Sequence, residues 1–229
     1  MNSDANIVDS VIRSRTAVRA FRPDAISKED VLAILDVART APSNSNTQPW
    51  RVYVLSGRSK QQLSDRLARA YADETYPLLN HLPDPLPHSF RVRQEDFGMR
   101  YYGALGIDKA DTAARTRATG RNFDFFGAPI GLIFTIERCL KKYSWLDYGL
   151  FLQNIMIAAR ARGLDTCPQV SFARYQTVIT NYLELEPGNE VVCGMSLGYA
   201  DEESIVNRLQ IPREPTDRFT RFLGLDAQS

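Results

Sequence analysis

The chain has 229 residues, 44% hydrophobic and 24% charged, which is ordinary for a soluble globular protein. Its 28 Lys and Arg against 27 Asp and Glu give a formal charge of +1, so nucleic acid and an anionic membrane are not expected as main partners. No apolar run approaches the ~20 residues of a membrane-spanning helix, and the N-terminus has no secretory-signal pattern. Three widely spaced cysteines favour neither a disulfide framework nor a metal site, so a cytoplasmic location is expected.

Helical and strand-like hydrophobic patterns alternate along the chain. The first clear helix is predicted to begin at Ser27, whose hydroxyl can cap it, and to stop at Pro42. Ser144 followed by Asp147 repeats the capping pattern before a long central helix. We therefore predict, in chain order, helices over 27–42, 59–74, 91–104, 109–126, 144–163 and 171–185, and strands over 51–56, 129–137 and 190–199.

No internal repeat, low-complexity block or linker divides the chain, so a single α+β domain over residues 1–229 fits best. A proline-rich stretch at 76–89 holds both histidines, His81 and His88, and is predicted to be an exposed, irregular excursion. The tail at 200–229 has little periodicity and is too long for a connection inside a compact domain.

The common signatures of catalytic side chains are missing. The sequence has no HExxH, no paired cysteines, no GxSxG, no P-loop and no GxGxxG. With two histidines, both in one proline-rich stretch, histidine-based nucleophilic catalysis is not expected. If the chain is an enzyme, a bound cofactor is therefore expected to carry its reactivity.

Two segments have the polar character that a cofactor site needs. In the first, Arg15, Ala17 and Arg19 point the same way if the chain is extended, and two guanidiniums on one face suit a phosphate. In the second, six consecutive small polar residues at 43–48 lie between two prolines and can wrap a polar planar ligand. The alternatives are a solvated basic stretch and a turn-rich loop.

These segments resemble the opening of the FMN-dependent nitroreductase family. The likeness rests on Arg15-x-Ala17-Val18-Arg19-Ala20-Phe21 and on Ala41-Pro42-Ser43-x-x-Asn46-x-Gln48-Pro49-Trp50. It continues through Asp147-Tyr148-Gly149, Gly163-Leu164-x-x-Cys167-Pro168-Gln169, Gly194-Met195-x-Leu197-Gly198-Tyr199, Asn207 and Arg213. Segments 96–107 and 125–129 make the chain look most similar to the bacterial branch that reduces nitroaromatics. Many members have Ser where Ala17 stands, so here arginines and backbone N–H groups are expected to hold the phosphate.

The resemblance implies a nitroreductase-like α+β fold with a central mixed β-sheet flanked by helices. It places an excursion and helices at about 76–126 over the active site, and a C-terminal extension at 200–229 around a partner. FMN would lie between two subunits of a homodimer. Phe219, Phe222 and Leu223 in the tail agree with this, because their own domain offers no obvious place to bury them.

The resemblance also implies roles for individual residues. Arg15 and Arg213 would hold the FMN phosphate, Arg19 would lie near the ribityl chain or the N1–O2 edge, and Asn44 would face the substrate. The expected cofactor contacts are Arg15, Thr16, Ala17, Arg19, Pro42, Ser43, Asn44, Asn46, Pro168, Gln169, Val170, Asn207 and Arg213. The expected substrate contacts are Asn44, Phe125 and Phe126. No side chain is expected to be catalytic, since the chemistry takes place at flavin N5, and no metal is expected.

The implied activity is ping-pong reduction of a small nitroaromatic or related electron-poor aromatic compound, with NADH or NADPH as electron donor. The alternatives are another flavin reaction on the same scaffold, such as reductive dehalogenation or enone reduction, and a flavin-binding protein without catalysis. A small interaction module without a cofactor is the remaining alternative.

Overall fold

A four-stranded β-sheet forms the centre of the protein. The computed structural model describes residues 3–73 and 82–224, so His81 lies outside the described residues. The strands are β1 (Arg51–Ser56), β2 (Ile130–Glu137), β3 (Asp165–Gln169) and β4 (Asn189–Gly198), in the order β1-β2-β4-β3. All three pairings between these strands are antiparallel. A mixed sheet was expected, and its parallel contact is a single bridge between Ala17 and Thr166 of β3.

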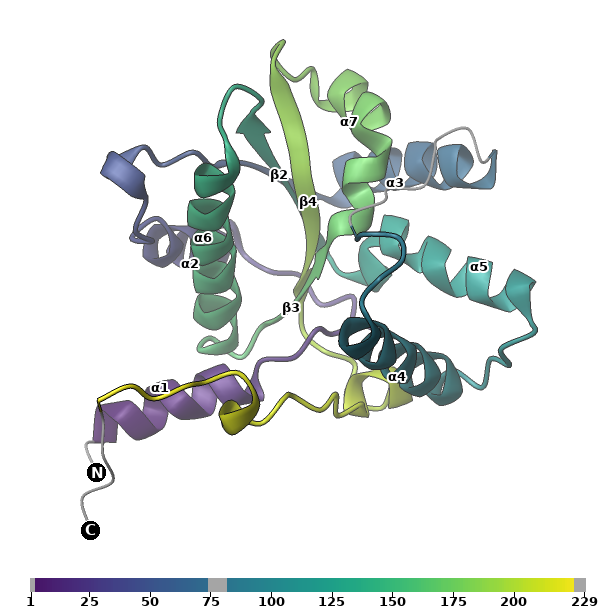
Figure 1. Ribbon diagram of the computed structural model, residues 1–229. Helices are drawn as coiled ribbons and strands as arrows, with labels where there is room; N and C mark the ends of the chain where they lie inside the picture. The colour runs from purple at the N-terminus through teal and green to yellow at the C-terminus, as the bar shows by residue number, and fades with distance from the viewer. Residues whose placement is uncertain (1–2, 74–81, 225–229) are drawn as a thin grey trace.

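Helices cover both faces of this sheet (Figure 1). Helices α2 and α6 pack on one face, and α3 and α7 pack on the other. The described α-helices are α1 (Ser3–Ser14), α2 (Lys28–Ala38), α3 (Gly57–Ala72), α4 (His88–Ala104), α5 (Thr112–Gly120), α6 (Lys142–Arg160) and α7 (Gln176–Leu183). Short 3₁₀ turns are η1 (Asn44–Asn46), η2 (Arg121–Gly127), η3 (Val170–Tyr175), η4 (Ile205–Arg208) and η5 (Thr216–Arg218). Over residues 3–73 and 82–224, no helix has the length and hydrophobicity needed to cross a membrane.

The core continues on both sides of the sheet because successive strand residues point to opposite faces. In β2, Leu132 and Phe134 pack towards α2 and α6, whereas Ile133 between them packs towards α3 and α7. Each of these three side chains is at most 1% exposed. A strand covered on both faces needs an almost continuous apolar run, which explains why β2 could be predicted from its sequence.

Most predicted elements are present, and α2 begins as its cap predicted. The Ser27 hydroxyl accepts a hydrogen bond from the Asp30 N–H over 3.0 Å. The second capping prediction is wrong: α6 begins at Lys142 after Lys141, so Ser144 lies inside the helix. The helix predicted over 109–126 and the one predicted over 171–185 each contain a 3₁₀ segment, η2 and η3.

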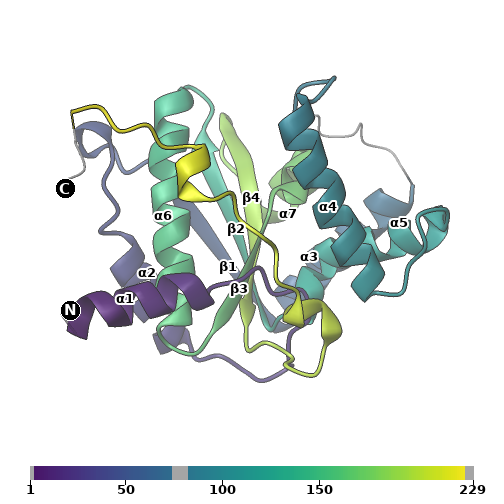
Figure 2. The ribbon, with the colours of Figure 1, turned by 60° about the horizontal axis from the view of Figure 1, so that its bottom comes forward.

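The C-terminal segment after β4 runs over the surface of the domain, where Glu214 pairs with Arg93 of α4 at 2.9 Å. Its first part packs inward through Val206, which is 3% exposed and contacts the α4 residues of a small core cluster. From η4 the chain then runs to the side of the molecule where α1 and α6 lie (Figures 1 and 2). Phe219 and Phe222 are each 69% exposed in the single chain. The expectation that this extension wraps a partner therefore stays a prediction.

Candidate functional site

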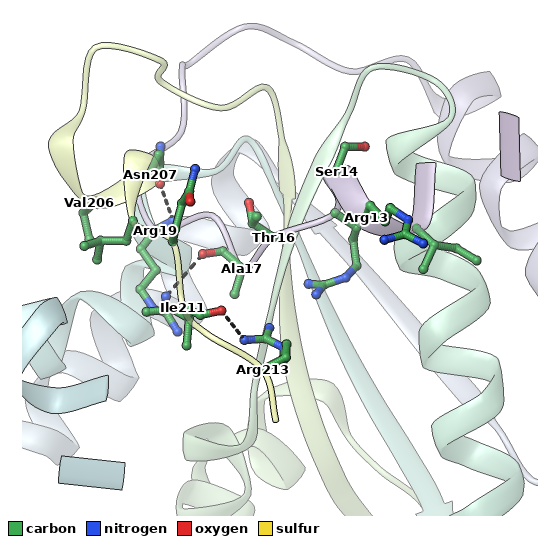
Figure 3. A pocket seen from close by; sticks show the side chains of 13 residues that line it. Arg13, Ser14, Thr16, Ala17, Arg19, Val206, Asn207, Ile211 and Arg213 are labelled. Carbon is green, nitrogen blue, oxygen red and sulfur yellow. Dashed lines mark hydrogen bonds between the residues drawn. The ribbon is translucent and has the colours of Figure 1, made fainter. Parts of the chain in front are cut away.

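A cavity of about 510 Å³ opens where the end of α1 meets the C-terminal segment (Figure 3). Helix α1 ends at Ser14, and the chain then continues in an extended form beside β3, where the Val18 N–H donates to the Thr166 carbonyl over 3.1 Å. The cavity is lined by Ile12, Arg13, Ser14, Arg15, Thr16, Ala17, Arg19, Val206, Asn207, Leu209, Gln210, Ile211 and Arg213. It therefore brings together the predicted Arg15–Arg19 segment and the predicted Asn207 and Arg213.

Arg15 and Arg213 bring two positive charges to the same cavity. Burial, and then the charge of Arg213, lower the pKa of Arg15 below its usual value. Over the described ranges, no carboxylate lies within ion-pair distance of either guanidinium. Among the described residues, Arg213 donates only to the Ile211 and Pro212 carbonyls, at 2.8 and 3.2 Å. Two neighbouring guanidiniums without a counter-charge form a site suited to a phosphate.

Arg19 is fixed between this cavity and α4. Its guanidinium lies 5.1 Å from the centre of the Phe97 ring and 5.2 Å from that of Tyr101, and donates to the Ala17 carbonyl over 3.3 Å. Cation–π contacts of this kind hold the cation in place without neutralising it. Phe97 and Tyr101 were not among the residues expected at the site, although their spacing of four residues on a predicted helix places them on one face.

Asn207 has a positioning role in this structure rather than a free side chain for a ligand. Its Oδ1 accepts from the Arg19 N–H over 2.8 Å, and its Nδ2 donates to the Ala20 and Asp201 carbonyls at 2.7 and 2.9 Å. Through these three hydrogen bonds the Asn207 amide joins the backbone of residues 19–20 to that of Asp201. The amide is therefore a clamp that holds Arg19 in place, and its expected direct contact with a cofactor stays a prediction.

The end of β3 lies beside the arginine segment. Burial raises the pKa of Cys167 to about 11, although the charges of Arg19 and Arg15 oppose this change. Gln169 is 3% exposed: its Nε2 donates to the Asn122 carbonyl over 2.7 Å, and its Oε1 accepts from the Ser196 hydroxyl over 2.8 Å. Its side chain is therefore occupied in the core, which leaves the backbone and the exposed Pro168 and Val170 to contact a ligand.

The polar loop at 43–48 is tightly folded on itself. The Ser43 hydroxyl accepts from the Gln48 N–H over 3.0 Å, and the Asn44 N–H donates to the buried Asp147 carboxylate over 3.0 Å. Ser45, Asn46 and Gln48 all have positive φ, a conformation that non-glycine residues rarely adopt. The Asn44 and Asn46 side chains are exposed, as are those of Pro42 and Gln48.

Within one chain, this loop lies far from the arginine cavity. Asp147, which holds the loop, is in the second turn of α6, whereas Arg160 at the end of α6 donates to the Ser14 hydroxyl over 3.1 Å. Thirteen residues of α-helix span ~20 Å. A single chain therefore does not bring the expected contacts at 42–46 together with Arg15 and Arg213.

The prediction that Phe125 and Phe126 line a substrate cavity is wrong for this structure. They are 0% and 2% exposed. Both residues have positive φ in η2, and this turn directs them into the protein. The Phe125 ring packs 4.7 Å from that of Phe172 and fills the space beside Gly131, where a Cβ atom would lie only 2.6 Å from the ring. The aromatic cluster is therefore part of the core.

The fold and the site together define an α+β protein with an arginine-lined cavity beside β3. Residues 12–199 match the nitroreductase family. A 4-nitrobenzoate reductase of Pseudomonas putida is 58% identical over 95% of this chain and 96% of its own length. A nitrobenzene nitroreductase of Ectopseudomonas oleovorans is 41% identical over 94% of this chain and 96% of its own length.

A solved structure agrees with these sequence relationships. The FMN-dependent nitroreductase NfnB from Mycobacterium smegmatis, in complex with NADPH, superposes with a TM-score of 0.92 at 34% identity, covering 96% of this chain and 100% of that one. The chain belongs to the nitroreductase family. The expected nitroreductase-like fold is thereby confirmed.

Proposed function

We propose that this protein is an FMN-dependent NAD(P)H oxidoreductase that reduces nitroaromatic compounds. The observation that carries the proposal is the pair of uncompensated guanidiniums, Arg15 and Arg213, in a cavity of about 510 Å³. The names of the similar enzymes, which include a 4-nitrobenzoate reductase and a nitrobenzene nitroreductase, support the nitroaromatic substrate. The solved relative with FMN and NADPH in its title supports the cofactor and the electron donor.

The residues present fit an FMN phosphate. Arg15 and Arg213 supply charge-assisted donors. Ala17 has no hydroxyl group, but the exposed hydroxyl of Thr16 lines the same cavity. When bound, FMN supplies the two-electron chemistry that links oxidation of NAD(P)H to reduction of the substrate. No side chain has to act as a nucleophile or metal ligand, and within 3–73 and 82–224 no group of three or more His, Cys, Asp or Glu could hold a metal ion.

The protein's own residues orient and tune the bound group. Arg19, held by two aromatic rings and by the Asn207 clamp, provides a fixed positive charge beside β3 that stabilises negative charge on a ligand. The exposed Pro168 and Val170 border the same region. Preorganised charge of this kind favours the reaction because it needs no rearrangement while charge develops.

We further propose that a second copy of the chain completes the site. Tyr143, Leu146 and Leu150 follow a helical spacing on α6 and are 63%, 63% and 41% exposed, so they form an uncovered apolar stripe. Asp147, on the same helix, carries the 43–48 loop. A copy packed on this stripe would bring its polar loop to the other copy's arginine cavity. Within one chain, the loop and the cavity lie ~20 Å apart. A cytoplasmic location remains part of the proposal.

The visible spectrum of the purified protein tests the proposal. We expect a yellow protein with one FMN per subunit, released intact on denaturation. NADPH should bleach the flavin, and a nitroarene added afterwards should restore its colour. FAD or no flavin in the mass spectrum would contradict the cofactor. A bleached flavin that reacts with a halophenol or an enone, but with no nitroarene, would contradict the substrate.

A further inference from the structure

The start of η2 is tied to the end of β3. The Gln169 side chain donates to both the carbonyl and the side-chain oxygen of Asn122, at 2.7 and 3.3 Å. Arg121 is the residue before Asn122, and neighbouring Cα atoms lie ~3.8 Å apart. The backbone of Arg121 is therefore held next to the segment 168–170, at the end of β3.

The Arg121 side chain has no structural role that would account for its charge. It is exposed, and across the described residues its guanidinium makes no hydrogen bond, ion pair or aromatic contact. Burial raises the pKa of the Tyr101 phenol, and the charges of Arg19 and Arg121 oppose that change. The charge of Arg121 therefore acts on the phenol of the residue whose ring lies under Arg19.

The arginines form a row that leads away from the phosphate cavity. Arg213 is close to Arg15, and the charges of both Arg15 and Arg19 lower the pKa of Cys167 against the effect of burial. Arg19 lies over the Tyr101 ring, and the charge of Arg121 acts on the phenol of the same tyrosine. The first two arginines suit the phosphate, and Arg19 is held between two rings, so Arg121 is the cation of this row left for another anion.

We propose that Arg121 is a specificity-determining residue that binds the carboxylate of an aromatic nitro acid, so that nitrobenzoates are preferred over neutral nitroarenes. The inference rests on the proposed function, because it assumes that the substrate reacts beside the segment 168–170. A planar guanidinium pairs with a carboxylate through two parallel N–H donors, which fixes both the position and the orientation of a flat ligand. A neutral nitroarene offers no such group.

Arg121→Gln tests this inference, because it removes the charge and keeps a flexible polar side chain. With the FMN-loaded protein and saturating NADPH, we expect kcat/KM for 4-nitrobenzoate to fall about ten- to a hundred-fold, mainly through KM, which is the size of one charge-assisted contact. For nitrobenzene we expect a change of less than about two-fold. Arg121→Lys should recover part of the loss. Arg117→Gln is the matched control, an exposed arginine one helical turn earlier.

A binding measurement separates this inference from the proposed function. Titration calorimetry with benzoate, which cannot be reduced, should give a dissociation constant about ten- to a hundred-fold weaker in Arg121→Gln than in the parent protein. Unchanged benzoate binding, or equal losses for both nitroarenes, would overturn the inference. A rise confined to the KM for NADPH would also overturn it, by assigning Arg121 to the donor's phosphate. A parent protein that binds benzoate through Arg121 but reduces neither nitroarene would instead contradict the proposed function alone.

Discussion

The backbone N–H of Asn44 donates to the Asp147 carboxylate over 3.0 Å, and this bond fastens the polar loop at 43–48 to α6. Asp147 is only 6% exposed, so its charge is held inside the protein for this contact. Because the loop is a proposed half of the FMN site and α6 the proposed subunit interface, one carboxylate connects the two. A change at Asp147 is therefore expected to affect cofactor binding without touching the arginine cavity.

Asp147→Asn is predicted to weaken FMN binding about three- to thirty-fold, because a hydrogen bond to a neutral acceptor is weaker than one to a carboxylate. A fluorescence titration of the apoprotein with FMN measures the change. Asp36→Asn, at an exposed carboxylate on α2, is the control and should bind FMN as the parent does. Parent-like binding in Asp147→Asn would mean that the loop needs no anchor on α6.

Arg213→Ala is predicted to weaken FMN binding more than it disturbs folding. A guanidinium–phosphate contact contributes about 1.5–3 kcal/mol, or roughly ten- to a hundred-fold in affinity. Within the part of the chain that the structure describes, the Arg213 side chain bonds only to the neighbouring Ile211 and Pro212 carbonyls, so the denaturation midpoint of the apoprotein should hardly move. Arg218→Ala, on η5 of the same tail, is the control. An unchanged dissociation constant would show that Arg213 does not hold the cofactor.

Asn207→Leu is predicted to disturb folding more than Arg213→Ala does. It removes three hydrogen bonds and leaves the Arg19 N–H without its acceptor, whereas the Ala20 carbonyl still accepts from the Asp201 N–H over 3.0 Å. An unpaired N–H costs about 1–3 kcal/mol where the group stays away from water. Urea unfolding of the apoprotein should therefore show a lower midpoint than for Arg213→Ala. Equal midpoints for the two variants would contradict the role of Asn207 as a clamp.

Local signals predicted most of the fold, and tertiary contacts decided the remainder. Ser27 and the apolar run of β2 act through near neighbours, so both could be predicted from sequence. Strand β3 could not, because Asp165–Gln169 contains an acid, a proline and an amide and becomes a strand only by pairing with β4. Ser144 followed by Asp147 has the spacing of a capping box, but Asp147 is instead the acceptor for Asn44.

The site was predicted as a set of residues and not as an arrangement. The spacing of Arg15 and Arg19 allowed a phosphate site as well as a solvated basic stretch, because an extended chain places both side chains on one face, and the resemblance to the family favoured the phosphate site. The distance between that site and the 43–48 loop depends on the length and packing of α6, which no motif encodes. The burial of Phe125 depends on a positive φ that its sequence does not signal. Tyr101 was missed because its role arises from contact with Arg19, a distant residue in sequence.

The buried Cys167 thiol is predicted to make the free energy of unfolding depend on pH in the alkaline range. Its pKa is about 11 in the folded protein, against an ordinary value of 9.0. At pH values below 9.0 the thiol is protonated in both the folded and the unfolded protein, so it does not change how the free energy of unfolding depends on pH. Above this value the unfolded chain binds fewer protons, so the free energy of unfolding falls with pH by up to ~1.4 kcal/mol per unit until the folded thiol ionises. Urea unfolding at about pH 8 and about pH 10 should show a steeper loss for the parent than for Cys167→Ser and Cys167→Ala. Equal slopes in all three would contradict this account.

The tail prediction concerns the apolar residues that follow Arg213. Phe219, Phe222 and Leu223 are 69%, 69% and 76% exposed in one chain, and each would contribute about 1.5–3 kcal/mol if a partner covered it. A chain ending at Glu214 keeps the Asn207 clamp, Arg213 and the ion pair from Glu214 to Arg93 at 2.9 Å. It should nevertheless be monomeric at micromolar concentration and should bind FMN more weakly, because the partner's 43–48 loop would be lost with the dimer. Light scattering and a flavin titration measure the two effects, and removal of residues 225–229 alone is the control. A shortened chain that stays dimeric would show that α6 is sufficient for assembly, and a monomer with full FMN affinity would show that one chain holds the whole site.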